Sequence, residues 1–303
     1  MFAVPIPVCT ARTTPAENAV NAMSAKPSQT ILPGVDPATL DFIIYHKHCI
    51  DGFGARFAAE LLLGKKATYL PAVYNDTPPP DNVLKGKRIG MFDFSFDRKL
   101  IEQLRGVAEL VVVVDHHKTE LDQVHFDLTK SGARLAWEFF HPDKPLPKFM
   151  AYIEDRLPKS KEFSAFFRTV PFNFEDFKRF HDNELLVDEA ITNGTQLLAV
   201  LNDKVMQICS NATTRTLRDT HHKVLVVNSP VFPSEVGQEL ASRDCDFGLV
   251  WFYDANRKSC RVSARSHDEK ADVSEIVKRF GGGGHRNAAG FTWNQKNVDD
   301  LFD

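Results

Sequence analysis

The segment LVVVVDHHK, residues 110–118, gives the clearest indication of the fold. Its four consecutive valines form an apolar, β-branched run, which is typical of a central parallel strand that is covered on both faces. The run stops at Asp115, and His116 and His117 follow at once. A charge beside such a strand is costly unless it is paired or bound to a metal. The segment therefore predicts a strand whose carboxyl end carries functional side chains.

Similar segments lie on the N-terminal side of this strand. Apolar runs predict strands at 42–45 and 88–94, and apolar residues at helical spacing predict helices at 52–63 and 96–104. Alternation of this kind is typical of a parallel sheet with crossover helices. In such sheets ligands bind at the carboxyl ends of the strands, which is where the acids and histidines of this sequence are expected.

The middle of the chain is predicted to be mainly helical, at 132–140, 148–156 and 183–209. It contains a phenylalanine cluster: Phe163, Phe166, Phe167, Phe172, Phe174, Phe177 and Phe180. We interpret the cluster as core or interdomain packing; the alternative is that one or two rings stack on bases.

Alternation resumes after Cys209. Strands are predicted at 223–228, 247–253 and 259–265, and helices from 234 and at 272–280. The polar stretch 211–220 is taken as the start of a second α/β domain.

The expected architecture is α/β with two domains and an active-site cleft between them. We assign 37–182 to an N-terminal parallel-sheet domain, 183–210 to a helical linker and 211–303 to a smaller α/β domain. Residues 1–36 are rich in Ala, Thr, Pro and Asn and cannot bury a core, so they are expected to be a disordered or targeting extension. The expected location is cytoplasmic, or mitochondrial or plastid if the extension is a transit peptide.

Composition excludes several classes of protein. The 303 residues are 43% hydrophobic and 25% charged, as in soluble globular proteins, and no apolar stretch could span a bilayer. A net charge of -3 argues against a partner such as long duplex nucleic acid. Five cysteines without CxxC spacing argue against a disulfide framework and favour a reducing compartment. The sequence is compatible with a homo-oligomer but does not define one.

Metal-ligand residue types follow the predicted strands of the first domain. They are His46, His48, Cys49 and Asp51 after the first, Asp93 after the second, Asp115, His116 and His117 after the third, and Asp155 at the end of a helix. Acids at three successive strand ends, each beside histidine or another acid, favour a divalent-metal site of oxygen and imidazole ligands. The alternative for Asp51, Asp93 and Asp115 is helix capping.

The second domain contains FGGGGHRNAAGF, residues 280–291. The run Gly281, Gly282, Gly283 and Gly284 leaves backbone N–H groups unshielded, so a phosphate or carboxylate can approach closely. His285 and Arg286 add charged donors beside it. Arg265 shares one side of a predicted strand with Arg261 and Ser263, which fits either an anion pocket or a solvent-facing surface.

These motifs, in this order, resemble the DHH phosphoesterase family with its DHH-associated C-terminal domain. The resemblance covers about residues 41–293, through YHKHCIDGFGA, an Asp strand end, Asp-His-His, a later Asp and GGGGHRNAAG. The opening YHKHCIDG is similar to a branch of predicted phosphohydrolases with a YHxxCxDG start. The resemblance implies two manganese-type ions between the domains, with Mg, Co or Zn as alternatives, and hydrolysis of a phosphoester in short nucleotides.

The resemblance also implies roles for individual residues. His46 and Asp51 would be first-motif ligands, Asp93 the ligand shared by both ions, and His116 and Asp155 ligands of the second ion. Asp115 and His117 would orient ligands or transfer protons. His285 and the backbone of Gly281 to Gly284 would hold the phosphate end of the substrate.

One position departs from the family pattern. Most members have another Asp where Cys49 stands, and thiolate suits zinc or iron better than manganese. Cys49 is therefore either a ligand that alters the choice of metal or a small buried residue, and His48 is a substitute ligand candidate.

The activity expected from these motifs is a metal-dependent phosphodiesterase that cuts short oligonucleotides or linear dinucleotides to mononucleotides by metal-activated water. Two alternatives stay open: a phosphatase acting on a bisphosphorylated nucleotide or polyphosphate, and a non-catalytic nucleotide-binding module.

Overall fold

The computed structural model describes residues 32–303 except 74–75, 117–124, 128 and 219. The chain divides into two compact units, one ending at Thr195 and the other beginning at Gln196. Each unit has its own sheet and its own hydrophobic core. The α/β class predicted from the alternation of strands and helices is confirmed.

The first unit is built on a parallel sheet. Its described strands are β1 (Phe42–His46), β2 (Thr68–Ala72), β3 (Arg88–Phe92), β4 (Leu110–Asp115) and β5 (His125–Phe126), in the order β2-β1-β3-β4-β5. Every described pairing in this sheet is parallel. Val112, Val113 and Val114 of β4 are buried, as the valine run predicts for a strand covered on both faces.

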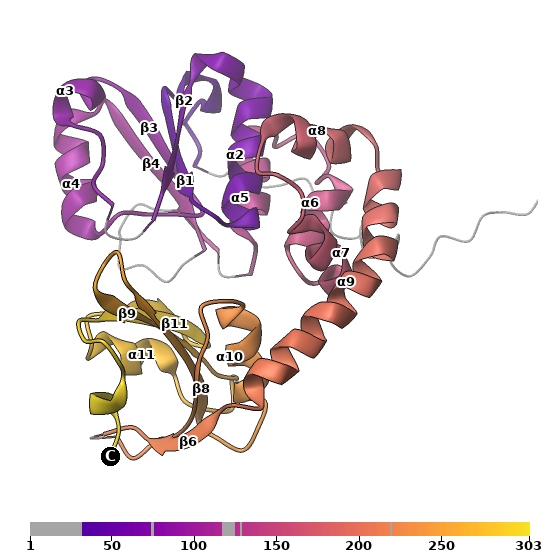
Figure 1. Cartoon of the computed structure of the whole chain (residues 1–303). Helices are drawn as coiled ribbons and strands as arrows, with labels where there is room; N and C mark the ends of the chain where they lie inside the picture. The colour runs from indigo at the N-terminus through magenta and orange to yellow at the C-terminus, as the bar shows by residue number, and fades with distance from the viewer. Residues whose placement is uncertain (1–31, 74–75, 117–124, 128, 219) are drawn as a thin grey trace, which may run out of the picture. The chain divides into compact units, whose positions relative to one another are not determined.

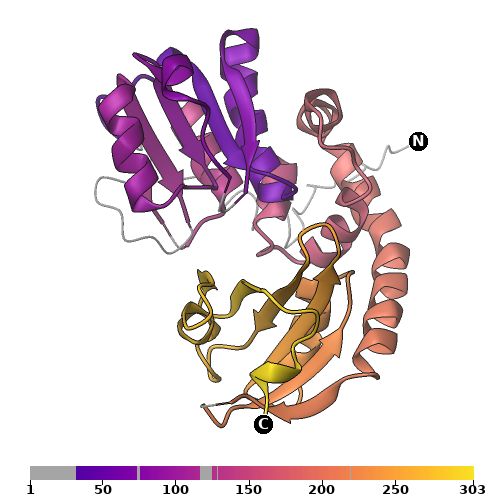
Figure 2. The ribbon, with the colours of Figure 1, turned by 60° about the vertical axis from the view of Figure 1, so that its left-hand side comes forward.

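Helices cover both faces of this sheet (Figures 1 and 2). On one face lie α2 (Ile50–Leu63) and α5 (Gly132–Phe140), which pack against each other and share the largest core cluster. On the other lie α3 (Asp81–Leu84) and α4 (Arg98–Val107), over a second cluster that includes Ile44, Ile89 and Ile101. The sheet thus has the doubly covered form that buried parallel strands require.

The strand order reverses beside β1. The chain passes from β1 to β2 on one side and then to β3 on the other, while β4 continues outward from β3. Open parallel sheets bind ligands at such a switch point, at the carboxyl ends of the strands. The ends of β1, β3 and β4 are therefore the place in this unit where a site is expected.

The rest of the first unit is helical. It contains α6 (Lys148–Ile153), α7 (Ser160–Phe167), α8 (Phe174–Asp182) and the start of α9 (Leu185–Cys209). Four members of the phenylalanine cluster, Phe163, Phe167, Phe177 and Phe180, are buried in the core of this unit. Their ring centroids lie 4.8 Å apart for Phe163 and Phe167 and 5.0 Å apart for Phe167 and Phe177. Core packing therefore accounts for these four rings.

The second unit is built on a mixed sheet. Its described strands are β6 (Thr213–Thr216), β7 (Lys223–Asn228), β8 (Phe247–Asp254), β9 (Ser259–Arg265), β10 (Gly283–His285) and β11 (Ala288–Trp293), in the order β10-β11-β9-β8-β7-β6. Only β7 and β8 pair in parallel among these described strands. Its helices are α10 (Pro233–Ala241) and α11 (Val273–Lys278), with the end of α9 packed near α10 through Val205 and Cys209.

Five of the described strands were not predicted from the sequence: β2, β5, β6, β10 and β11. Residues 213–216 were expected to be part of a polar boundary but form the edge strand β6, where solvent-facing threonines need no apolar alternation. Residues 68–72 form the edge strand β2, whose Pro71 is tolerated because an edge strand has a side without ladder hydrogen bonds. In the part of the chain that is described, no helix is long and apolar enough to cross a membrane.

Candidate functional site

The carboxyl ends of three neighbouring strands bring the predicted ligands together. His46 is the last residue of β1, Asp93 follows β3 directly, and Asp115 is the last residue of β4. Because these strands are adjacent and parallel, their ends meet at one edge of the sheet. Asp93 and Asp115 are almost completely buried, at 1% and 0% exposure.

The backbone turns sharply at this edge. Asp93 has a φ of +54°, a left-handed conformation that aspartate tolerates better than most residues and that is often kept at functional sites. Its N–H still bonds the carbonyl of Val114 at 3.2 Å, so the turn stays anchored to the sheet. Gly52 lets α2 start close to β1, since a Cβ there would lie 2.3 Å from the carbonyl oxygen of His46.

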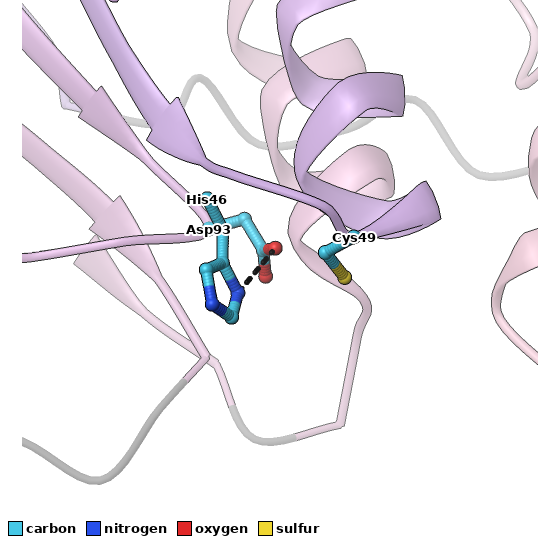
Figure 3. Close-up of side chains that lie close together, drawn as sticks. All are labelled: His46, Cys49 and Asp93. Carbon is cyan, nitrogen blue, oxygen red and sulfur yellow. Dashed lines mark ion pairs between the residues drawn. The ribbon is translucent and has the colours of Figure 1, made fainter. Parts of the chain in front are cut away.

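The first ligand cluster consists of His46, Cys49 and Asp93. One donor atom from each of the three side chains lies within 4.8 Å of the others. His46 Nδ1 is 3.7 Å from Asp93 Oδ2, and Figure 3 shows this carboxylate between the imidazole ring and Cys49. The cluster offers nitrogen, sulfur and oxygen donors at one point.

The second ligand cluster consists of Asp51, Asp93 and His116, again with donors within 4.8 Å of one another. His116 Nε2 lies 2.9 Å from Asp93 Oδ1 and 3.4 Å from Asp51 Oδ2. Asp93 thus belongs to both clusters. This is the position that the resemblance assigns to a ligand shared by two ions.

Electrostatics show that this edge favours a positive charge. Burial, together with the charge of Asp93, raises the pKa of Asp51 to about 7, although His116 and two backbone N–H groups lower it. Burial lowers the pKa of His116, but its hydrogen bond to Asp93 and the nearby carboxylates outweigh that and raise it to about 9. Burial and the charges of Asp93 and Asp51 raise the pKa of the Cys49 thiol to about 12. Converging buried carboxylates are stabilised by a cation.

The N-terminus of α5 holds Asp51 of the second cluster in place. Asp51 accepts hydrogen bonds from the backbone N–H groups of Gly132, at 3.0 Å, and Ala133, at 2.6 Å. These are N–H groups that a helix cannot satisfy within itself. Gly132 is also needed for close approach, because a Cβ there would lie 2.4 Å from the Cβ and Oδ1 of Asp93.

Two further side chains complete this helix terminus. Ser131 Oγ accepts from the N–H of Arg134 at 3.2 Å, and Glu154 Oε1 accepts from the N–H of Ser131 at 3.2 Å. Glu154 also pairs with the Arg134 guanidinium at 3.0 Å. Sequence reasoning missed Gly132, Ser131 and Glu154. The only signal in the sequence was Ser131 directly before the 132–140 helix, which indicates a capped helix start. No neighbouring residue indicated that this helix start would contact Asp51.

The other predicted residues of the first unit are placed differently. Asp115 Oδ1 accepts the N–H of His116 at 2.8 Å, so it holds that residue at the strand end. Asp155, which follows α6 with a φ of +54°, is exposed and is in neither described ligand cluster. His48 is exposed and is likewise in neither. His117 lies outside the described residues.

The glycine run in the second unit forms the edge strand β10 and the turn before it. Gly281 has a φ of +72° and Gly284 a φ of +143°. A Cβ at Gly282 would lie 2.4 Å from the carbonyl oxygen of Gly290, and one at Gly284 would lie 2.5 Å from that of Ala288. Gly283 alone among the four combines an unremarkable φ with open space for a Cβ. Backbone conformation and packing therefore require three of the four glycines.

The charged residues near this loop have partners within the second unit. Arg286 bonds the carbonyls of Asp268 and Lys270, at 2.8 and 3.0 Å, and Asp272 at 3.3 Å. It therefore ties the β9–α11 connection to the β10–β11 turn. Arg265 lies along α10 and donates to Ser234 Oγ at 2.8 Å. His285 pairs with Ala288 across the hairpin.

Comparison with known proteins agrees with these features. The family model of the DHHA1 domain matches residues 238–303, which include the glycine run. "Uncharacterized protein R106" of Acanthamoeba polyphaga mimivirus is 33% identical over 286 residues, which cover 84% of this chain and 68% of that protein. The chain belongs to the DHH phosphoesterase family with a DHHA1 domain. The Asp-His-His sequence stands at residues 115–117, in the part of the chain that precedes the matched DHHA1 segment.

Solved structures of low sequence identity are also similar in outline. RecJ from Thermus thermophilus, determined with Mn²⁺, is 15% identical with a TM-score of 0.46, covering 92% of this chain and 51% of RecJ. The pGpG-specific phosphodiesterase PggH from Vibrio cholerae is 9% identical with a TM-score of 0.45, covering 86% and 96%. An exopolyphosphatase-related protein from Bacteroides fragilis is 14% identical with a TM-score of 0.46, covering 84% and 86%.

Proposed function

We propose that this protein is a metal-dependent phosphodiesterase that hydrolyses short oligonucleotides or linear dinucleotides to mononucleotides. The observation that carries the proposal is the pair of ligand clusters that share Asp93. Two adjacent metal positions with a common carboxylate are the arrangement used for in-line phosphoryl transfer to water. Membership of the DHH phosphoesterase family supports the same reaction class.

The donor set fits divalent metal ions. Asp51, Asp93 and His116 supply oxygen and imidazole ligands, which suit manganese and similar ions. The raised pKa of Asp51 and the near-complete burial of Asp93 mean that positive charge would relieve a real electrostatic cost at this position. When bound, two such ions would acidify a water molecule and stabilise the charge that develops on the phosphoryl oxygens.

The residues of the chain have separate tasks in this proposal. Asp93 would be a ligand at both positions, and the N–H groups at the α5 terminus bind and orient the Asp51 carboxylate. Asp115 orients the His116 backbone. We assign proton transfer to the leaving oxygen to His117, which the sequence places next to His116. Asp155 remains a proposed ligand that would have to join the second cluster from the segment after α6.

We assign capture of the terminal phosphate to the second unit. The backbone at Gly283, the His285 imidazole and the Arg265 guanidinium would contact the anion, and Arg286 would act by holding the loop in shape. We infer that a glycine-rich loop of this kind would bind a terminal phosphate rather than the middle of a chain, so we expect short substrates cut from one end. The net charge of -3 supports the same choice over long nucleic acid.

A substrate panel tests the proposal. Purified protein is incubated with Mn²⁺, Mg²⁺, Co²⁺ or Zn²⁺ and with 5'-phosphorylated dinucleotides, longer oligonucleotides, bisphosphorylated adenosine and polyphosphate. We expect fastest turnover of dinucleotides and a loss of at least about a thousandfold in Asp93→Asn, since both metal positions use that carboxylate. The matched control is Asp97→Asn, because Asp97 only caps α4 and asparagine caps equally well.

The outcomes separate the candidate functions. Turnover of bisphosphorylated adenosine or polyphosphate alone would favour the phosphatase. Tight binding of nucleotides without turnover in any metal would favour the binding module. Full activity in Asp93→Asn would contradict a reaction at this strand edge.

A further inference from the structure

The two ligand clusters differ in chemistry although they share one carboxylate. His46, Cys49 and Asp93 offer nitrogen, sulfur and oxygen, whereas Asp51, Asp93 and His116 offer two oxygens and a nitrogen. Thiolate ligands select zinc, iron and related ions, whereas carboxylate-rich sites suit manganese and magnesium. The first cluster has a sulfur donor where the second has a carboxylate oxygen, so the two clusters are expected to prefer different metal ions.

Cys49 precedes α2 in an extended conformation. Its sulfur lies at the first turn of that helix, where the backbone N–H groups of Gly52 and Asp51 favour the thiolate, and it also faces the cluster. The backbone of Cys49 also takes part in the start of α2, because the Cys49 carbonyl accepts the N–H of Phe53 at 2.9 Å. The side chain is half-buried and lies on the side of the strand ends where His46 and Asp93 lie (Figure 3).

The other described cysteines provide a contrast. Cys209, Cys245 and Cys260 are buried, and each directs its thiol to a backbone carbonyl, at 3.7, 3.2 and 3.2 Å respectively. Among the described residues, none of these three belongs to a cluster that could hold a metal ion. They behave as small core residues, whereas Cys49 faces an imidazole and a carboxylate.

The geometry of the first cluster is close to that of a metal site. Tetrahedral zinc with one sulfur, one nitrogen and one oxygen ligand needs donor atoms about 3.3 to 3.6 Å apart. His46 Nδ1 and Asp93 Oδ2 are already 3.7 Å apart, and all three donors lie within 4.8 Å. The three donors would have to approach one another by about 1 Å or less to reach these separations.

We propose that Cys49 binds metal through its sulfur as a thiolate, so that the His46–Cys49–Asp93 cluster takes a thiophilic divalent ion such as Zn²⁺ while the Asp51–Asp93–His116 cluster takes Mn²⁺. The thiol proton leaves to solvent when the sulfur binds. The inference rests on the metal centre of the proposed function and specifies its metals: the two positions are filled by different ions.

Cobalt spectroscopy tests this without any substrate. Metal is removed from the full chain with a chelator and Co²⁺ is titrated in, because a cobalt–thiolate bond produces an intense near-ultraviolet charge-transfer band. We expect the band in the wild type and in Cys260→Ser, which removes a buried thiol that bonds Gln295. We expect no band in Cys49→Ser or Cys49→Asp. Circular dichroism establishes that each variant is folded.

The failures are distinguishable. Stoichiometric cobalt binding by the wild type without the band, or with a band that persists in folded Cys49→Ser, would overturn the Cys49 assignment alone. Failure of both the wild type and Cys49→Asp to bind cobalt would overturn the metal centre, and with it the proposed function.

A competition experiment measures the selectivity. Metal-free wild type and Cys49→Asp are dialysed against mixtures of Zn²⁺ and Mn²⁺, and bound metal is determined by elemental analysis. Loss of the thiolate should lower the preference for zinc over manganese at least about tenfold. An unchanged ratio would overturn the assignment of a thiophilic position.

Discussion

The carboxyl ends of the parallel strands in the first unit and the glycine loop of the second would contribute to the proposed function in opposite ways. At the strand ends the side chains would bind the metal ions, and glycines and a left-handed aspartate let those side chains meet. In the glycine loop, the backbone N–H groups are proposed to bind the phosphate, and the side chain of Arg286 holds the loop in its conformation.

This difference determines what a substitution can reveal. A ligand at the strand edge can be exchanged while the sheet beneath it stays intact, so loss of function is informative. In the loop, Gly282 and Gly284 are required by packing, so their loss affects folding and binding together. Gly283 is the position in the loop where the two effects separate.

Among the glycine substitutions, the largest effect is expected from Gly132→Ala. The added Cβ would lie 2.4 Å from Asp93 and must displace it or the α5 terminus that binds Asp51. Displacement of about 1 Å at a reacting centre can cost about a hundredfold in rate, so we expect turnover to fall at least about a hundredfold and metal affinity to fall with it. Steady-state kinetics and metal titration measure both.

The matched control is Gly106→Ala. Gly106 lies on the exposed surface of α4 with open space for a Cβ, so alanine should leave activity unchanged and stabilise the helix by about 0.5 to 1 kcal/mol. Equal activity in Gly132→Ala and Gly106→Ala would contradict the positioning role of the α5 terminus.

A buried histidine in the first unit should make stability depend on pH. His141 is buried beneath α2 and bonds the carbonyl of Ala58 at 2.9 Å. Burial, and to a lesser degree the charges of Lys144 and His181, lower its pKa from 6.5 to about 4 against the effect of the Ala58 hydrogen bond. The unfolded chain binds this proton from pH 6.5 downward and the folded chain does not, so the contribution of His141 to stability falls between pH 6.5 and 4. We expect that contribution to fall by about 2 kcal/mol between pH 7 and 5. Asp51, whose pKa is raised to about 7, acts in the opposite direction over the same interval, so the effect of His141 is the difference between the wild type and a variant that lacks it.

Denaturant unfolding of the wild type and His141→Gln at the two pH values measures this effect. Glutamine can still donate to the Ala58 carbonyl but does not titrate, so on going from pH 7 to pH 5 the variant should change in stability by about 2 kcal/mol in the favourable direction relative to the wild type. An equal pH dependence in the variant would show that other groups control the acid response.

Gly282→Ala tests whether packing requires the loop glycines. Its Cβ would lie 2.4 Å from the carbonyl oxygen of Gly290 across the β10–β11 hairpin, so we expect a destabilisation of about 1.5 kcal/mol. Thermal unfolding followed by circular dichroism measures it. Unchanged stability would mean that the hairpin edge adjusts freely.

Gly283→Ala should have the smallest and most specific effect. Its Cβ would meet no atom within 4 Å, so the free energy of unfolding should change by less than about 0.5 kcal/mol. If the backbone here approaches the substrate phosphate, the methyl group should raise KM about tenfold with little change in kcat. An unchanged KM would assign the glycine run to packing alone.

Much of this organisation could be predicted from local sequence. The valine run predicted β4, helical spacing predicted α2 and α5, and acids after apolar runs predicted that ligands would gather at one sheet edge. These features depend on residues close together in the chain. The edge strands β2 and β6 were not predicted, because a half-exposed strand lacks the apolar pattern that identifies a buried one.

The fold class, the family and the ligand types could be inferred from residue identity and short spacing in the chain. Which ligands share a cluster became known from the folded structure. Cys49 joins His46 and Asp93, while Asp155 stands in neither cluster and Gly132 lies against Asp93. The physical reason is that the distance between residues far apart in the chain depends on strand register and helix packing. Those are properties of the folded core as a whole, which no local stretch of sequence encodes.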